Sequence, residues 1–279
     1  MNDFSLLLPE FLVAGLAFFI LALDLFIKEN WKRYLVWVAF FGLAVILFVS
    51  LFIESEGQLY DGLLEFDEFT KFFRIFFLII GGVTVIISRE YVDSRLKYPG
   101  EYYGILLFTL LGAMLLASSA ELLTAYINLE LLSCGLYVLV GYESYNPKSN
   151  EASVKYILLG AFSSALILFG ISQIYGLLGT TRFDEMSVAF SSLSSISPGM
   201  AVGFVLIVSG LGFKLAAVPF HMWAPDVYEG APLPITAWLS VGSKAAALAL
   251  AIRLFSEGFI SVFGELQPCL LYTSDAADE

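Results

Sequence analysis

Residues 211–250 read LGFKLAAVPFHMWAPDVYEGAPLPITAWLSVGSKAAALAL. An apolar run carries Lys214 inside it and then breaks at a cluster of prolines, and a second apolar run carries Lys244 near its middle. An ordinary membrane helix has neither feature, because non-helical backbone is tolerated at membrane depth only where it lines a cavity or is buried in protein. Ionisable groups at that depth are costly and indicate function. We therefore expect the chemistry of this protein to lie in this stretch.

The composition is that of a membrane protein with several spans. Hydrophobic residues make up 59% of the chain and charged residues 14%, with a mean hydropathy of +0.84, whereas a soluble domain has too few interior positions for so much apolar surface. The net charge is -12 and there is no basic patch, so we do not expect binding to nucleic acid. Cys134 and Cys269 lack the spacing of a zinc or redox site, and we expect Cys134 to be a small buried side chain.

Runs of about 20 apolar residues are long enough to cross a bilayer. Eight such runs predict an all-α polytopic membrane protein with about eight transmembrane helices: residues 8–27, 33–53, 70–88, 102–118, 121–142, 153–177, 199–218 and 234–254. Because the seventh run ends in the proline-rich break, we expect that helix to be discontinuous. The first run lacks a basic flank, so we expect a retained helix rather than a cleaved signal peptide.

Loop charges predict the orientation of these helices. The first and third connections are basic and the second is acidic; the basic residues are Lys28, Lys32, Arg33, Arg89, Arg95 and Lys97. Positively charged loops face the cytoplasm, so the N-terminus should lie outside. The connection over residues 179–198 contains apolar residues that could form a short amphipathic element on the outer surface.

Four ionisable residues lie within or close to apolar runs: Glu130, Lys155, Lys214 and Lys244. A charge at mid-span costs about 2.5–3.5 kcal/mol on insertion scales, so it is retained only if it pairs, faces water or does chemical work. Glu130 and Lys244 lie about 15 Å from the aqueous edge, and the alternative to function there is a buried structural ion pair. Lys155 lies near the start of its span and could instead extend to the interface. Lys214 precedes the break and could face a hydrated pocket.

Three lysines and one glutamate at this depth suit a proton path. Burial lowers the pKa of a lysine and a nearby carboxylate raises it again, so moving the carboxylate away favours release of the proton. Ser240 and Ser243 beside Lys244 would leave room for bridging water. His221 could relay protons near neutrality or bond carbonyls freed by the prolines, and both interpretations stay open. Asp24 we expect to pair with Lys28, four residues later.

The motifs around these residues resemble a known family. FKLAAVPFHMWAPDVYEGAPLPITAWLSVGSKAAALAL is similar to the proton-translocating region of the antiporter-like subunits of respiratory complex I. VYEGAP and SVGSKAAA resemble subunit N of NADH-quinone oxidoreductase more than its M and L relatives. NLELLSCGLYVLVGY and EASVKYILLGAFSSALILFG also fit, and the similarity extends from residue 1 to about residue 265.

The resemblance implies a role for each candidate residue. Glu130 would pair with Lys214 of the seventh helix, Lys155 would be the sixth-helix lysine, and Lys244 would lie on the central hydrophilic axis, with His221 in the broken helix. The implied protein is a membrane-arm subunit of NADH:quinone oxidoreductase, a multi-pass protein of a bacterial plasma membrane that moves protons beside neighbouring membrane-arm subunits. NADH, FMN, iron–sulfur clusters and quinone would belong to other subunits, so we expect no cofactor, metal or redox centre in this chain.

The family also implies an organisation. Its members have about fourteen helices with two inverted repeats, a transporter pattern. We expect three N-terminal helices over residues 1–98, the first antiporter-like repeat over 99–254, and a truncated end over 255–279 that is foreign from about 268; such a polypeptide would not pump by itself. The alternatives are a subunit of a multisubunit cation/proton antiporter or of a membrane-bound hydrogenase, which neighbouring genes would distinguish, or a purely structural role for the buried charges.

Overall fold

The structure, a computed structural model, describes residues 4–53, 56–193 and 197–260. Helices dominate it, and eight of them are long and apolar enough to cross a membrane: Phe4–Phe26, Glu29–Phe52, Glu68–Arg95, Pro99–Ala117, Leu122–Val140, Pro147–Leu178, Pro198–Leu215 and Leu233–Gly258. The prediction of an all-α polytopic protein with eight spans is confirmed. The expected foreign segment from about residue 268 lies outside the described residues.

The first five spans are built from continuous helices with short additions. A 3-10 turn, η1 (Phe4–Leu7), precedes the first helix and a single turn, α2 (Glu29–Lys32), precedes the second. The long helices are α1 (Leu8–Phe26), α3 (Leu35–Phe52), α4 (Glu68–Arg95), α5 (Pro99–Ala117) and α6 (Leu122–Val140). The helix of the third span, α4, extends past residue 88, where the apolar run ends. Its last turns are charged and remain helical in water, whereas the length of an apolar run reflects only the thickness of the bilayer.

The last three spans are less regular. The sixth span is α7 (Pro147–Leu178), followed by the short α8 (Phe183–Ser191), and the seventh is α9 (Pro198–Leu215), followed after a break by α10 (Ala224–Gly230). The eighth joins α11 (Leu233–Trp238), η2 (Leu239–Ser243), α12 (Lys244–Arg253) and η3 (Leu254–Gly258). Both η2 and η3 are π-helical turns, a geometry that often marks functional sites. The predicted amphipathic element corresponds to α8.

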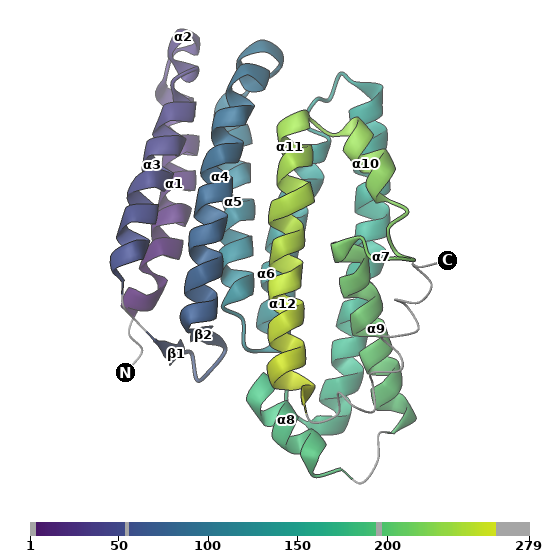
Figure 1. Cartoon of the computed structure of the whole chain (residues 1–279). Coiled ribbons are helices and arrows are strands. Elements are labelled where there is room, and N and C mark those ends of the chain that lie inside the picture. Colours follow the sequence, from purple (N-terminus) through teal and green to yellow (C-terminus); the bar gives the residue numbers. More distant parts are fainter. Residues whose placement is uncertain (1–3, 54–55, 194–196, 261–279) are drawn as a thin grey trace.

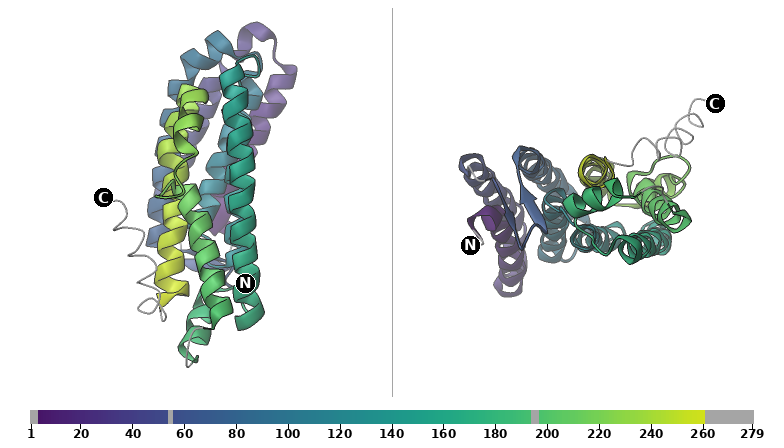
Figure 2. Two further views of the ribbon diagram at one scale, coloured as in Figure 1. Left: turned by 90° about the vertical axis from the view of Figure 1, so that its right-hand side faces the viewer. Right: turned by 90° about the horizontal axis from the view of Figure 1, so that it is seen from below.

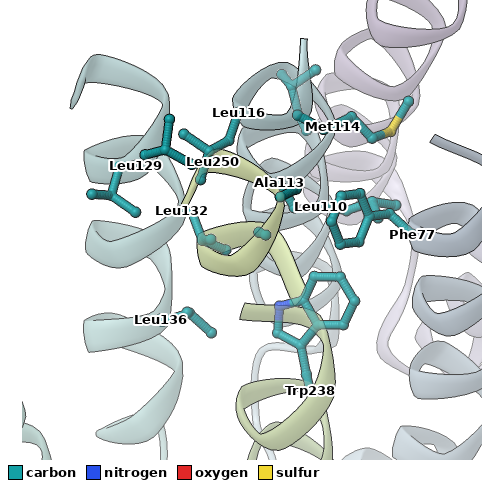
Figure 3. Packing of buried hydrophobic residues seen from close by; sticks show 14 of the residues in the cluster. Phe77, Leu110, Ala113, Met114, Leu116, Leu129, Leu132, Leu136, Trp238 and Leu250 are labelled. Atoms are coloured by element: carbon teal, nitrogen blue, oxygen red, sulfur yellow. The ribbon is translucent and has the colours of Figure 1, made fainter. Parts of the chain in front are cut away.

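Chain order and spatial order differ at the last span. In Figure 1, α1 and α3 lie at one side and α7 and α9 at the other, while α11 and α12 return to pack between them against α4, α5 and α6. The view from below in Figure 2 also places the N-terminal helices at one side. Trp238 of α11 is fully buried and lies near Phe77 of α4 and Leu110 of α5 (Figure 3). The eighth span therefore joins the N-terminal helices to the rest of the bundle.

Glycines allow the backbones of neighbouring helices to approach closely at two places in the bundle. A Cβ added at Gly112 of α5 would lie 2.7 Å from the backbone nitrogen of Leu132 in α6, and one added at Gly170 of α7 would lie 2.7 Å from the carbonyl oxygen of Gly203 in α9. Small residues permit such approach between membrane helices, where dispersion contacts replace a hydrophobic driving force. The first contact holds α5 against α6 and the second holds α7 against α9.

The acidic second connection folds as a β-hairpin, which the sequence did not lead us to expect. Strands β1 (Gly57–Leu59) and β2 (Leu64–Phe66) pair antiparallel. The backbone N–H of Glu65 donates to the carbonyl oxygen of Ser118 at 2.8 Å, and that of Ala120 donates to Leu63 at 3.0 Å, so the hairpin packs on the turn between α5 and α6. Strands of three residues are too short to give a periodic signal. The available local signal was the Asp61-Gly62 turn, where both residues have positive φ.

Two local expectations were wrong. Cys134 is exposed on α6 rather than buried, because an apolar run does not reveal which of its faces contacts the bilayer. Asp24 pairs with Lys32 at 3.4 Å rather than with Lys28. The chain turns after Phe26 into the separate helix α2, which brings Lys32 back over the end of α1.

Candidate functional site

An ion pair between a buried lysine and a half-buried glutamate lies between α6 and α9. The Nζ atom of Lys214 lies 3.6 Å from Oε1 of Glu130, and Lys214 is only 8% exposed. The fold thus brings together the two residues whose pairing the family resemblance implied. A charge so far from water needs both a counter-charge and hydrogen-bond partners.

Neutral hydroxyl groups complete the surroundings of Lys214. Its ammonium group donates to Ser133 Oγ at 2.8 Å and to Tyr137 Oη and Ser164 Oγ at 3.4 Å each. Ser164 of α7 in turn donates to Glu130, so one serine bridges the two charges. We did not single out these three residues from the sequence. The spacing i, i+3, i+7 from Glu130 to Ser133 and Tyr137 places them on one helix face and was the available signal.

The seventh helix breaks directly after Lys214, as predicted. Helix α9 ends at Leu215, and Ala216 takes a left-handed conformation with φ 55°. The indole N–H of Trp223 donates to the carbonyl oxygen of Phe213 at 2.9 Å, which satisfies a backbone group freed by the break. The Trp223 ring stacks on Phe213, with ring centroids 5.3 Å apart. These contacts involve one side of the break, whereas residues 217–219, 221 and 222 are exposed.

His221 lies in this break but not in the ion pair. It is exposed, and within the described residues its imidazole makes no hydrogen bond or ion pair. Its backbone carbonyl accepts from the N–H of Ala224 at 2.9 Å. One role considered for His221 was a hydrogen bond to a carbonyl group freed by the break. Trp223 makes that hydrogen bond instead, and we did not single out Trp223 from the sequence.

Lys155 belongs to a different cluster at the start of α7. Its ammonium lies 2.6 Å from Asp226 of α10 and 2.7 Å from Glu151. Lys148 and Glu229 pair beside them at 2.7 Å, and the hydrogen bond and charge of Lys148 lower the pKa of Glu229. These five charged residues line a cavity of about 110 Å³. Lys155 is partly exposed near the start of α7, and the Lys155–Asp226 and Lys148–Glu229 pairs attach α10 to α7.

Lys244 holds its charge without a carboxylate. It is the first residue of α12, directly after the π-helical turn, and its Nζ lies 5.4 Å from the centroid of the Tyr228 ring. No ion pair involves it in the part of the chain that the structure describes. The hydroxyls of Ser240 and Ser243, expected to leave room for water, instead donate to backbone carbonyls of Ala237 and Leu239. The Tyr228 hydroxyl is buried and has no protein partner among the described residues.

Aromatic rings connect the buried Lys214 to the half-buried Lys244. Lys214 lies 5.8 Å from the Tyr137 ring centroid, and Tyr137 contacts Tyr156 with centroids 4.7 Å apart. Tyr156 stacks on Trp223 at 4.9 Å, and Trp223 meets Tyr228 at 6.1 Å. A layer of four rings therefore separates Lys214 from Lys244.

Metal or cofactor ligands are scarce in this arrangement. Over residues 4–53, 56–193 and 197–260 no three His, Cys, Asp or Glu side chains are grouped so that they could hold a metal ion. The polar groups around Lys214 are hydrogen-bonded to one another.

Comparisons with known proteins show which family the chain resembles. Residues 119–273 match the family described as NADH:quinone oxidoreductase/Mrp antiporter, TM. NADH-quinone oxidoreductase subunit N of Desulforamulus reducens is 42% identical over 92% of this chain and 54% of its own length, and that of Bacillus anthracis is 41% identical over 95% and 54%. The chain thus spans about half the length of the curated relatives it matches.

Two solved structures share the fold. Respiratory complex I from Thermus thermophilus contains a chain that matches with a TM-score of 0.74 at 29% identity, over 88% of this chain and 53% of that one. The membrane-bound sulfane sulfur reductase, an archaeal respiratory membrane complex, contains one with a TM-score of 0.77 at 25% identity, over 97% and 57%. Because the family match covers more than half of its residues, the chain belongs to the NADH:quinone oxidoreductase/Mrp antiporter transmembrane family.

Proposed function

We propose that this chain is part of a proton-translocating membrane-arm subunit of an NADH:quinone oxidoreductase, a translocase whose redox chemistry takes place in other subunits. The observation that carries the proposal is the Glu130–Lys214 pair, which joins a lysine that is 8% exposed to a carboxylate 3.6 Å away. The names of the curated relatives support the assignment to subunit N.

The pair can act as a proton switch. While Glu130 is near, its charge holds the proton on Lys214. If Glu130 moves away, Lys214 keeps only neutral partners in Ser133, Tyr137 and Ser164, and its burial then favours release of the proton. A conformational or electrical pulse that reaches Glu130 is thereby converted into proton transfer.

The other site residues receive roles within the same proposal. Lys244 is the next station, beyond the aromatic layer, and Lys155 with Asp226 lies at the membrane edge, where protons enter or leave. His221, exposed in the break, is a relay at the water side. Residues 1–98 form the N-terminal three-helix unit and residues 99–254 the antiporter-like repeat.

The cellular setting is also part of the proposal. We place the protein in the plasma membrane of a bacterium, with its N-terminus outside and neighbouring membrane-arm subunits beside it. NADH, FMN, iron–sulfur clusters and quinone act in other subunits of that complex. A multisubunit cation/proton antiporter is the second candidate, because the family description includes Mrp antiporters. Genes for NADH dehydrogenase subunits beside this one would favour the first assignment.

The test is substitution of the pair in an assembled complex that carries these residues. We expect Glu130→Gln and Lys214→Met each to lower NADH-driven proton pumping in inverted vesicles at least about tenfold, the scale of a lost acid–base group. Glu143→Gln is the matched control, since Glu143 pairs with Arg95 at 3.4 Å beyond the end of α6. Unchanged pumping in variants that assemble normally on a native gel would show that the buried pair is only structural.

A further inference from the structure

An open apolar groove runs between α1 and α3 on the outside of the bundle. Its volume is about 800 Å³, and the residues that matter here are Phe11, Gly15, Phe19, Trp37, Phe41 and Val45. A second cavity of about 240 Å³ shares Tyr34 and Val38 with it and extends it to Lys28. We call the two together the α1–α3 groove.

The groove is hollow where a side chain is missing. A Cβ built at Gly15 meets nothing within 4 Å, so the glycine leaves a recess in its floor. Phe11, Phe19 and Phe41 on its walls are 55%, 54% and 60% exposed. Surfaces this apolar are stable at membrane depth only against hydrocarbon or another protein.

One end of the groove is basic, and its cations lack acidic partners. The Arg33 guanidinium lies 5.1 Å from the Tyr34 ring centroid, and that of Arg89 lies 5.3 Å from Trp37, so aromatic residues of the groove fix both. Among the described residues neither arginine nor Lys28 forms an ion pair. The nearby carboxylates of α1 and α2 are occupied, because Lys32 pairs with both of them.

We propose that the α1–α3 groove binds an anionic diacyl phospholipid. The acyl chain lies in the groove and the phosphate lies at its basic end, where a planar guanidinium can bind two phosphate oxygens at once. The dimensions agree: the α3 wall from Tyr34 to Ile46 rises about 18 Å, slightly more than the roughly 15 Å depth of one leaflet. Tyr34 and Trp37 lie at the level where interfacial aromatic residues are enriched.

Charge complementarity distinguishes this occupant from a neighbouring subunit. A helix of another subunit could cover the apolar walls, but it would leave Arg33 and Lys28 without counter-charge unless it also supplied acidic groups. Arg89 shares a separate cavity with Glu90 and Asp93 of its own helix. A phosphate supplies the charge and the acyl chain supplies the apolar surface in one molecule. Basic pockets between membrane helices on the cytoplasmic side bind such head groups.

The test measures which lipids the chain retains. The chain is equilibrated with equal amounts of phosphatidylglycerol and phosphatidylethanolamine, and retained lipid is counted by native mass spectrometry. We expect Arg33→Gln/Arg89→Gln to lower the ratio of retained phosphatidylglycerol to retained phosphatidylethanolamine about tenfold. Each of the two cations contributes to the free energy of binding an anionic head group. Arg95→Gln/Lys97→Gln, the same change of charge at the same end of the bundle, should leave the preference unchanged.

A second pair of variants tests the groove itself. Gly15→Leu fills the recess and should lower the amount of either lipid several-fold, whereas Gly176→Leu, at an equally open position on α7, should not. If Gly15→Leu and Gly176→Leu retain equal lipid, or the arginine variant keeps its preference, the proposal fails. It also fails if a photo-crosslinker at Val45 in the assembled complex captures a protein rather than lipid. Should the arginine variant unfold, Lys28→Gln tests the same phosphate contact.

Discussion

Lys214 and Lys244 hold their charges in different ways. Lys214 has a carboxylate within 3.6 Å and three hydroxyl partners, whereas Lys244 has the face of one tyrosine ring, 5.4 Å from its ammonium. A ring face attracts a cation by about 0.5–2 kcal/mol, less than a buried ion pair gains from Coulomb attraction. The two lysines therefore depend on different partners: Lys214 on a carboxylate and hydroxyl groups, and Lys244 on the face of a ring.

The Tyr228 ring, rather than its hydroxyl, should be what Lys244 needs. We expect Tyr228→Leu to lower proton pumping roughly 2- to 30-fold, the range of a cation–π contact, while Tyr228→Phe stays near wild type because it keeps the ring. Removal of a buried hydroxyl without a protein partner should also leave the unfolding temperature of Tyr228→Phe unchanged or raised.

A double-mutant cycle separates this contact from general packing. In a Lys244→Met background, Tyr228→Leu should cause no further loss of pumping, because the cation is already gone. Equal losses with and without Lys244 would mean that the ring only fills space. A loss in Tyr228→Phe as large as in Tyr228→Leu would assign the role to the hydroxyl.

The sequence predicts the charged members of this site but not the neutral ones. Glu130 and Lys214 stand out because a charge in an apolar run is unusual, and the fold brings them together. Ser164 and Tyr228 belong to residue types that occur throughout the chain, and only the packing of α7 on α9 and of α10 near α12 gives them their positions. The same packing places Lys155 beside Asp226 at the edge.

Arg253 fastens the end of α12 to the hairpin and to α4. It is 2% exposed and forms ion pairs with Asp67 at 2.8 Å, with Glu257 at 3.1 Å and with Glu65 at 3.3 Å. Asp67 has a second task, since its carboxylate accepts from the N–H of Thr70 at 2.8 Å and caps α4. The Asp67 carboxylate therefore joins the start of α4 to the end of α12.

Stability should depend on the ionisation of Asp67. Burial acts to raise its pKa, but the Thr70 hydrogen bonds and the Arg253 charge outweigh it, so the pKa lies below the ordinary 3.8. The stabilisation is therefore present above pH 3.8 and lost as the pH falls through the lowered pKa. We expect Asp67→Asn to lower the unfolding temperature in detergent at neutral pH, and the difference from wild type to shrink as the pH falls below about 4.

Glu68→Gln is the control for this measurement, because Glu68 is next in sequence and its side chain is 78% exposed. Its effect on the unfolding temperature should be small at every pH. A difference between wild type and Asp67→Asn that persists unchanged into acid would mean that charge is not how Asp67 stabilises the fold.

Hydropathy predicts the helices of this protein better than their connections. The eight apolar runs correspond to the eight spans of the structure, and the proline cluster indicated the break that follows α9. The π-helical turns and the pairing of Arg253 with Asp67 depend on tertiary contacts and leave no local pattern.

The two ends of the bundle differ in charge. The connections that hold Lys28 and Arg95 lie at the end marked by α2 in Figure 1, and the acidic hairpin lies at the opposite end, near the N-terminus. Basic loops remain on the cytoplasmic side during insertion. The α2 end is therefore the cytoplasmic end in our proposal.

Cysteine labelling in right-side-out vesicles tests this orientation. In a chain with Cys134→Ser and Cys269→Ser, we expect a membrane-impermeant maleimide to label Tyr60→Cys in intact vesicles and Asn30→Cys only after they are opened. Val45→Cys, on the exposed apolar face of α3, should remain unlabelled in both because it faces hydrocarbon. The reverse pattern would invert the orientation.

The ion pairs of Arg253 with Glu65 and Asp67 also determine when, during synthesis, the eighth span can pack against α4. Asp67 precedes its partner by 186 residues, so at about 5–20 residues per second it is translated roughly 10–40 s before the guanidinium arrives. During that interval the hairpin carboxylates have only water and Thr70 as partners, and α4 and α5 present an open seam to the membrane. Closure of that seam by the eighth span is thus the last assembly step among the described helices, and a ribosome stalled before codon 253 would leave a substrate for membrane quality control.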